Sequence, residues 1–250
     1  MIENSKILEK LKSDNFILLK NKIDKNLLKK ILVNVQAAKK KIKNKRDIHY
    51  IKTEKGKKLS SLHNIHLYSK FYKNFILNSG LNRVIEKIYG SSSKKIFNSS
   101  YFIKPSKVGI ETKMHQDNAY FNLKKGQALT CWIPLDKTNK KNSCLYYYRN
   151  SSKLGNLRHL ASGNPGASMS IHRDERFIKK IKKFKKVFVK ADFGDCIIHD
   201  AFVVHGSSVN SSVFERRAFN FSIKSKCDIR DKKKFFDYKN KLRKFLNKIN

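Results

Sequence analysis

Three residues that could meet at one metal ion constrain the fold of this chain more than any other feature. They are His115 and Asp117, two positions apart, and His205 far downstream. Two imidazoles and one carboxylate can hold a metal on one face and leave the opposite coordination positions open. Open positions let reactants bind the ion directly, so this ligand set predicts a centre that does chemistry. The long stretch between the ligands leaves room for the strands of a barrel.

The local pattern suggests how these side chains would converge. In an extended strand, side chains two positions apart point to the same face. His115 and Asp117 should therefore present two ligands from one strand end, with Gln116 pointing away. His205 ends the apolar run 197–204, as expected of a buried strand that delivers the third ligand inward.

Two other histidines compete for these roles. His172 and Asp174 form a second His-x-Asp pair, but it lies in a charged stretch typical of a helix start and too close to His205 for the barrel strands. His199 lies in the same apolar stretch as His205, and we expect it to face the opposite side. A packed or surface histidine is the expected role of His199.

An arginine gives independent support for the site. Arg216 follows the polar turn 206–212, and a hairpin over that turn would bring it deep beside the metal, with Arg217 pointing the other way. A guanidinium grips a carboxylate bidentately, and 2-oxoglutarate has a distal carboxylate that needs such a grip. A buried unpaired arginine is costly, so a carboxylate ligand would offset that cost. The alternative is that both arginines are surface charges.

The first part of the chain, residues 1–95, is predicted to be mostly helical. A first strand is possible at 16–19, and apolar residues recur at helical spacing after Asp24, a plausible N-cap. The charge run 39–45 fits a solvated helix end or loop. Two more short helices are expected at 69–77 and 82–88.

The residue pattern changes near residue 95, after which short apolar segments alternate with turn residues. Strands are predicted at 100–103, 128–134, 145–148, 168–171, 187–189, 196–199, 202–205 and 217–223. Such punctuation is typical of a sandwich or barrel. We expect a mainly β fold with helices. Its core at 96–225 would be a double-stranded β-helix (jelly-roll, cupin-like), closed by a basic C-terminal helix at 226–250. The 250 residues fit one domain of this kind, spanning 1–250.

The net charge of +38 comes mainly from lysine and is spread over the whole chain. It admits three interpretations: the codon bias of an AT-rich genome, an anionic substrate, or nucleic-acid binding. We rank them in that order, because lysine suits the reading of base edges less well than arginine. A nucleic-acid partner is therefore not expected.

The sequence also bounds the compartment. No window is long and apolar enough for a transmembrane helix, and residues 1–12 lack the apolar core of a secretory signal. The four cysteines, at 131, 144, 196 and 227, show no C-x-x-C pair and no zinc spacing. Reduced thiols in a cytoplasm are the expected setting.

Four stretches carry a family resemblance. They are M-H-Q-D-N-A-Y-F at 114–121, L-T-C-W-I-P-L-D at 129–136, the segment 142–155 that begins N-S-C-L, and the segment 194–218 with H-G-S-S-V-N and R-R-A. Together they resemble the phytanoyl-CoA dioxygenase family of Fe(II)/2-oxoglutarate-dependent oxygenases. The likeness covers roughly 95–222 and, more loosely, 62–90. It departs at 149–152, where the family's P-G-S-H turn reads R-N-S-S.

The resemblance implies roles for individual residues. Fe2+ would be bound by His115, Asp117 and His205. Arg216 would pair with the distal carboxylate of 2-oxoglutarate, Ser207 would help to hold it, and Trp132 would line the pocket. The candidates for the substrate pocket are Gln116, Tyr120 and Phe121, while His63 and His66 could reach its mouth or simply pack.

The implied reaction consumes O2 and 2-oxoglutarate, releases succinate and CO2, and hydroxylates an unactivated C–H bond of a small molecule. The many lysines favour an anionic substrate. Asp117 argues against halogenation, because related halogenases lack this carboxylate. Two alternatives stay open: an oxygenase that acts on nucleic acid through its basic surface, and a non-catalytic binding module. The sequence specifies neither the substrate nor the oligomeric state.

Overall fold

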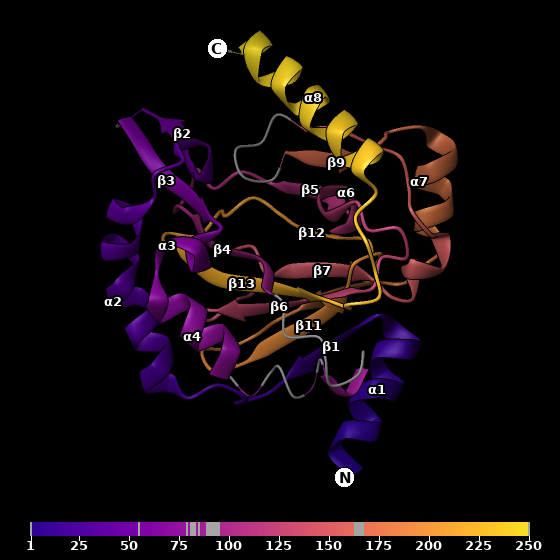
Figure 1. The fold of residues 1–250 in the computed structure, drawn as a ribbon, viewed down its shortest axis with the longest axis horizontal. Coiled ribbons are helices and arrows are strands. Elements are labelled where there is room, and N and C mark those ends of the chain that lie inside the picture. Colours follow the sequence, from indigo (N-terminus) through magenta and orange to yellow (C-terminus); the bar gives the residue numbers. More distant parts are fainter. Residues whose placement is uncertain are drawn as a thin grey trace.

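The computed structural model consists of facing β-sheets with helices around them (Figure 1). It describes residues 2–54, 56–78, 80, 84, 86–88, 96–162 and 168–249. The helices there are α1 (Ile2–Asp14), α2 (Lys25–Lys41), α3 (Ile65–Tyr68), α4 (Lys70–Asn78), α6 (Asn118–Phe121), α7 (Glu175–Lys182) and α8 (Lys232–Ile249), with 3-10 turns η1 (Lys45–Asp47) and η2 (Ser151–Leu154).

The strands account for the centre of the molecule. They are β1 (Phe16–Leu19), β2 (Ile48–Thr53), β3 (Gly56–His63), β4 (Ile96–Lys104), β5 (Thr112–His115), β6 (Ala128–Pro134), β7 (Leu145–Tyr148), β8 (His159–Ala161), β9 (Met169–Ile171), β10 (Lys186–Val189), β11 (Cys196–Asp200), β12 (His205–Ser207) and β13 (Arg216–Lys224). A seven-stranded sheet has the order β1-β11-β6-β13-β4-β3-β2, a four-stranded sheet the order β10-β7-β12-β5, and β8 pairs with β9. This arrangement confirms the predicted mainly β fold with a double-stranded β-helix core.

Side chains alternate between the two faces of the large sheet, as the pleat requires. On β6, Cys131 and Ile133 join the core under the helices, whereas Trp132 joins the cluster between the sheets. On β13, Phe219 and Phe221 likewise face the helices, and Ala218 faces inward. This alternation lets one sheet build a hydrophobic core on its outer face and a polar centre on its inner face.

Helices α2 and α4 cover that outer face. Asp24 caps α2, where its carboxylate accepts a hydrogen bond from the Leu27 amide at 2.8 Å. Leu28 and Ile31 then point into the core, where the Tyr72 ring of α4 tilts against Phe219. The predicted cap and helix are therefore confirmed, and so is the helix predicted at 69–77.

Some sequence predictions need correction. Residues 48–63, expected to be helical or loop, form the hairpin β2–β3 that extends the large sheet. The strand predicted at 202–205 begins only at His205, because a turn occupies the preceding residues. The strand expected to carry the first ligand is β5, which ends at His115, whereas β8 was not predicted. In the helix predicted at 82–88, residues 84 and 86–88 are described and are helical, whereas 82, 83 and 85 lie outside the described residues.

The C-terminal helix α8 confirms the predicted closing helix and lies across the end of the barrel near α6 and β9 (Figure 1). Its Tyr238 ring lies 6.3 Å from the ring of Tyr120, which follows the proposed ligands. No helix in the described part of the chain is long and apolar enough to cross a membrane.

Candidate metal centre

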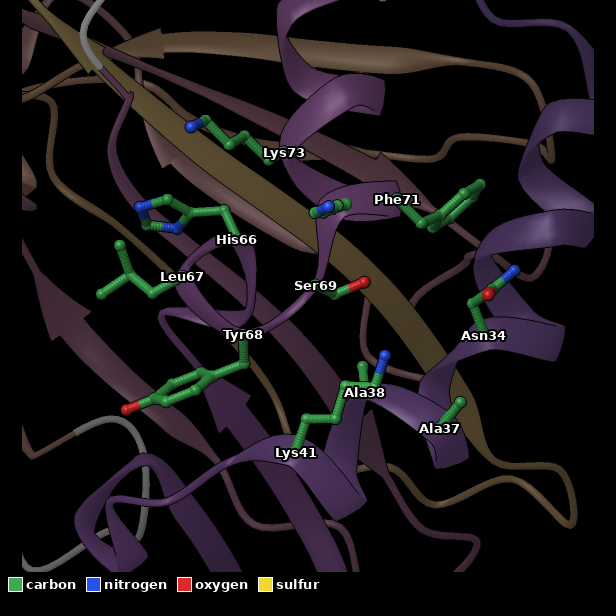
Figure 2. Close-up of a pocket in the computed structure, with 11 residues that line it drawn as sticks. Asn34, Ala37, Ala38, Lys41, His66, Leu67, Tyr68, Ser69, Phe71 and Lys73 are labelled. Atoms are coloured by element: carbon green, nitrogen blue, oxygen red, sulfur yellow. The ribbon is translucent and has the colours of Figure 1, made fainter.

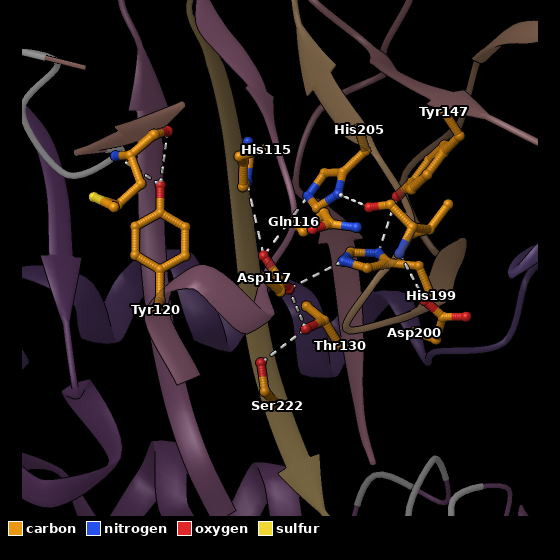
Figure 3. Close-up of polar contacts among 12 residues, drawn as sticks. His115, Gln116, Asp117, Tyr120, Thr130, Tyr147, His199, Asp200, His205 and Ser222 are labelled. Carbon is orange, nitrogen blue, oxygen red and sulfur yellow. Dashed lines mark hydrogen bonds and ion pairs between the residues drawn. The ribbon is translucent and has the colours of Figure 1, made fainter. Parts of the chain in front are cut away.

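Three potential ligands, His115, Asp117 and His205, converge between the two sheets (Figure 3). Their ligand atoms all lie within 4.8 Å of one another, and each imidazole Nε2 is 3.7 Å from Asp117 Oδ1. His115 ends β5 and His205 begins β12, and these two residues are register partners in the small sheet. Asp117 is not extended but is the N-cap residue just before α6, with helical backbone angles, so the chain bend, rather than strand alternation, aims it at the histidines.

The backbone fixes which imidazole nitrogen is free. His115 Nδ1 lies 2.8 Å from the Lys113 carbonyl, and His205 Nδ1 lies 3.0 Å from the Val203 carbonyl. Because a carbonyl can only accept, both Nδ1 atoms carry the proton and both Nε2 atoms keep a lone pair for a metal. Burial also lowers the pKa of both imidazoles, which favours their neutral, ligating form.

Asp117 uses its two oxygens differently. Oδ1 faces the two imidazoles, whereas Oδ2 accepts hydrogen bonds from Thr130 Oγ1 at 2.5 Å and His199 Nε2 at 3.2 Å. Burial alone would raise the pKa of Asp117, but the His199 hydrogen bond and the nearby imidazoles outweigh it and hold the pKa below its usual range. The carboxylate is therefore ready to bind a cation through Oδ1.

His199, expected to be a packed or surface histidine, lies beside the three potential ligands. It faces inward from β11, and its ring centroid is 4.6 Å from that of His205. The expected opposite orientation is wrong. The chain bends between β11 and β12 and passes to the opposite sheet, so His199 and His205 approach the same centre from facing sheets. Tyr147 lies 3.0 Å from His199 Nδ1, and burial keeps the phenol pKa well above its usual range, so the phenol donates. His199 Nδ1 therefore accepts from Tyr147, and His199 Nε2–H donates a hydrogen bond to Asp117 Oδ2.

Arg216 and Trp132 lie on the same inner face. The Arg216 guanidinium carbon is 5.5 Å from the Trp132 ring centroid, and Arg216 is 3% exposed. Its Nε has no hydrogen-bond partner among the described residues, while Arg217 turns away to pair with Asp136 at 2.6 Å. The inward Arg216 and outward Arg217 match the prediction, but β12 and β13 belong to opposite sheets, so no hairpin joins them.

Ser207 contacts Lys104, a residue that the sequence did not indicate as part of the site. Its hydroxyl accepts a hydrogen bond at 2.7 Å from the ammonium of Lys104, at the end of β4. Lys104 is 7% exposed and is the register partner of Arg216. The one sequence signal for Lys104, among so many lysines, is its position in the strand, which places its side chain on the inner face.

The three candidates for the substrate pocket lie in different surroundings in the structure. Gln116 is fully buried, and its side-chain amide is engaged by the backbone of Gly155, Phe202 and Leu157. Phe121 packs against Phe97 in a separate cluster. Tyr120 remains beside the metal residues, with its ring 5.7 Å from that of His115.

His63 and His66, which could either reach the mouth of the pocket or simply pack, are hydrogen-bonded within the large sheet and beside it. His63 bonds the hydroxyls of Ser61 and Ser100, and His66 bonds that of Ser99. His172 and Asp174 lie outside the site, and Asp174 caps α7 as expected of a helix start. A separate pocket of about 720 Å³ opens between α2 and the segment α3–α4, and none of the three potential ligands lines it (Figure 2).

Comparison with known proteins identifies the family. The family model for phytanoyl-CoA dioxygenase (PhyH) matches residues 12–218. The chain belongs to the phytanoyl-CoA dioxygenase family. A phytanoyl-CoA dioxygenase domain-containing protein 1 homolog of Caenorhabditis briggsae is 25% identical over 178 residues, 69% of this chain and 61% of that protein. A phytanoyl-CoA dioxygenase of Arabidopsis thaliana is 25% identical over 64% of this chain and 55% of its own length. The chain thus spans about three fifths of these relatives.

Solved structures share the fold of this PhyH family member. The α-ketoglutarate-dependent epimerase SnoN from nogalamycin biosynthesis superposes with a TM-score of 0.70 at 17% identity, over 91% of this chain and 84% of its own. EctD from S. alaskensis, solved with bound Fe, gives 0.72 at 17% identity, over 88% and 76%. Another EctD structure holds 2-oxoglutarate and 5-hydroxyectoine.

Proposed function

We propose that this protein is an Fe(II)- and 2-oxoglutarate-dependent dioxygenase that hydroxylates an unactivated C–H bond of a small molecule. The observation that carries this proposal is the set of two lone-pair Nε2 atoms and one carboxylate oxygen within 4.8 Å of one another. This donor set fits Fe(II) and leaves positions open for other ligands. Arg216, buried with an unpaired Nε, fits a carboxylate such as that of 2-oxoglutarate.

Each residue has a distinct task in this proposal. Iron would supply the activation of O2 that couples decarboxylation of 2-oxoglutarate, to succinate and CO2, with insertion of one oxygen atom into the substrate. His115, Asp117 and His205 hold the ion, and His199 orients Asp117. Arg216 and Ser207 hold the distal carboxylate, and the apolar cluster around Trp132 excludes water.

The test is binding followed by turnover. Under anaerobic conditions, Fe(II) and 2-oxoglutarate together should give the visible charge-transfer band of a chelated keto acid. With O2, a library of small molecules, anionic ones included, should reveal compounds that raise the rate of succinate release. Hydroxylated product is identified by mass spectrometry. Protein that takes up no ferrous ion would overturn the proposal.

Asp117→Ala removes the carboxylate ligand and should strongly weaken Fe(II) binding and reduce both the band and succinate release, because the ion loses its one negatively charged protein ligand. Asp174→Ala is the matched control, since it removes the acid of the second His-x-Asp pair, outside the site. Wild-type turnover by Asp117→Ala would contradict the assignment.

A further inference from the structure

Two buried cations lie side by side on the inner face of the large sheet. Lys104 and Arg216 are register partners on β4 and β13 and are 7% and 3% exposed. Neither has a carboxylate within 4.0 Å among the described residues, since Asp136 pairs with Arg217. Burial and the charge of Arg216 both lower the pKa of Lys104. Glu111 and Asp136 act on Lys104 and Arg216 only from beyond contact distance. Two adjacent buried cations without a contacting carboxylate are costly, so this corner is suited to an anion.

The hydrogen bonds of Lys104 also determine what Ser207 can do. The ammonium donates to Ser207 Oγ at 2.7 Å and to the Ser208 carbonyl at 2.8 Å, and it lies 3.4 Å from the Ser207 carbonyl. A hydroxyl that accepts from an ammonium keeps its own proton for another acceptor. Ser207 donates that proton to no described residue, so it is available to a ligand.

We propose that Lys104 is a positioning residue for the distal carboxylate of 2-oxoglutarate: it holds Ser207 as a hydrogen-bond donor and adds a second positive charge beside Arg216. This inference rests on the proposed function and deepens it. Lys104 acts through Ser207 and through its field, because its own donors are already engaged by protein oxygens. It gives the site a stronger preference for a 2-oxo acid with a distal carboxylate than Arg216 alone would provide.

The experiment compares two cosubstrates in Lys104→Met and in wild type. 2-Oxoglutarate and 2-oxovalerate chelate a metal through the same keto-acid end, but 2-oxovalerate lacks the distal carboxylate. Their dissociation constants are measured by calorimetry with Mn(II) bound and O2 excluded. We expect Lys104→Met to weaken 2-oxoglutarate binding by about 10- to 100-fold and to leave 2-oxovalerate binding nearly unchanged.

Controls separate this role from a purely structural one. Lys224→Met removes a half-buried ammonium that donates to two backbone carbonyls at the other end of β13, and it should not change the ratio of the two constants. In the double variant with Ser207→Ala, the two losses should be less than additive if Lys104 acts through Ser207. If Lys104→Met does not fold, Lys104→Gln carries the same test.

The outcomes distinguish the two proposals. Wild-type protein that binds 2-oxoglutarate, together with a Lys104→Met ratio equal to that of wild type, would overturn the role of Lys104 and leave the oxygenase proposal intact. Equal weakening of both cosubstrates would also overturn it, because that is the signature of a general loss of structure. Wild-type protein that binds no 2-oxoglutarate would overturn the oxygenase proposal itself.

Discussion

At the scale of single residues, the two carboxylate oxygens of Asp117 have different partners. This difference determines which oxygen is available to bind a metal ion. Thr130 and His199 occupy Oδ2, and Ser222 in turn lies 2.9 Å from Thr130 Oγ1. Since Thr130 gives its proton to Asp117, Ser222 must donate to Thr130. The chain of donors leaves Oδ1 alone for the ion and favours monodentate binding.

Replacing His199 by leucine should therefore weaken metal binding without unfolding the protein. The variant keeps most of the side-chain volume but removes the donor to Oδ2, and loss of such an orienting partner typically costs 10- to 100-fold in metal affinity. Calorimetric titration with Co(II) measures the change, and circular dichroism checks the fold. His172→Leu, outside the site, serves as the control. Unchanged Co(II) affinity in His199→Leu would contradict the role of His199.

The three potential ligands could be predicted from sequence because their types and spacing are restrictive, whereas the residues that contact them could not. The positions of His199 and Lys104 depend on which face of the strand each side chain occupies and on which sheet each strand joins. Sheet membership is a feature of the tertiary structure. Thr130 carries no distinctive local pattern. Gln116 has a predictable direction, away from the ligands, but the loops it joins are far apart in sequence.

At the scale of elements, β12 is short but central, since it pairs with both β5 and β7. Gly206 lies in the middle of it. A Cβ built on Gly206 would lie 2.6 Å from the Thr112 carbonyl and 2.6 Å from the Tyr146 hydroxyl. The close approach of the strands to one another therefore requires glycine at this position.

Gly206→Ala should separate β12 from its neighbours and lower the free energy of unfolding by about 1–3 kcal/mol, because the backbone carbonyl cannot move aside cheaply. Metal affinity should fall as well, since His205 precedes this residue. Denaturant titration and Co(II) binding measure the two effects. Ser208→Ala, just beyond the strand, is the control. A fully stable Gly206→Ala protein would show that the strands can shift without cost.

The strands that were predicted best are those with uninterrupted apolar runs between turn residues. The bounds predicted for β6 and β7 agree with the structure. The hairpin β2–β3 was not predicted because its lysines and serines interrupt the alternation of apolar and polar residues that marks a strand. It also gains stability only by pairing with β4, which the local sequence does not show.

At the scale of the whole molecule, buried neutral histidines link stability to pH. Burial lowers the pKa of His63 to about 3 and those of His66 and His159 to about 4. Between these values and 6.5, the unfolded chain binds protons that the folded protein does not. Stability is therefore fully present above about pH 6.5 and is lost as the pH falls toward 4.

The free energy of unfolding should thus decrease by roughly 1 kcal/mol per pH unit for a well-buried histidine such as His63 between pH 6 and 4. Denaturant titrations at several pH values measure the slope. His63→Gln should flatten it relative to wild type, whereas Asp174→Asn, at an exposed helix cap, should leave the histidine contribution in place. A slope that is unchanged in His63→Gln would contradict this account.

The depth of the metal residues has a kinetic consequence. His115, Asp117 and His205 are only 7%, 9% and 5% exposed, and Tyr120 flanks the ring of His115. An ion seated among them could leave only when the surrounding wall opens. The rate at which a chelator removes the ion should then become independent of chelator concentration. A colorimetric assay of the released ion would in that case measure the rate constant of local opening around the site.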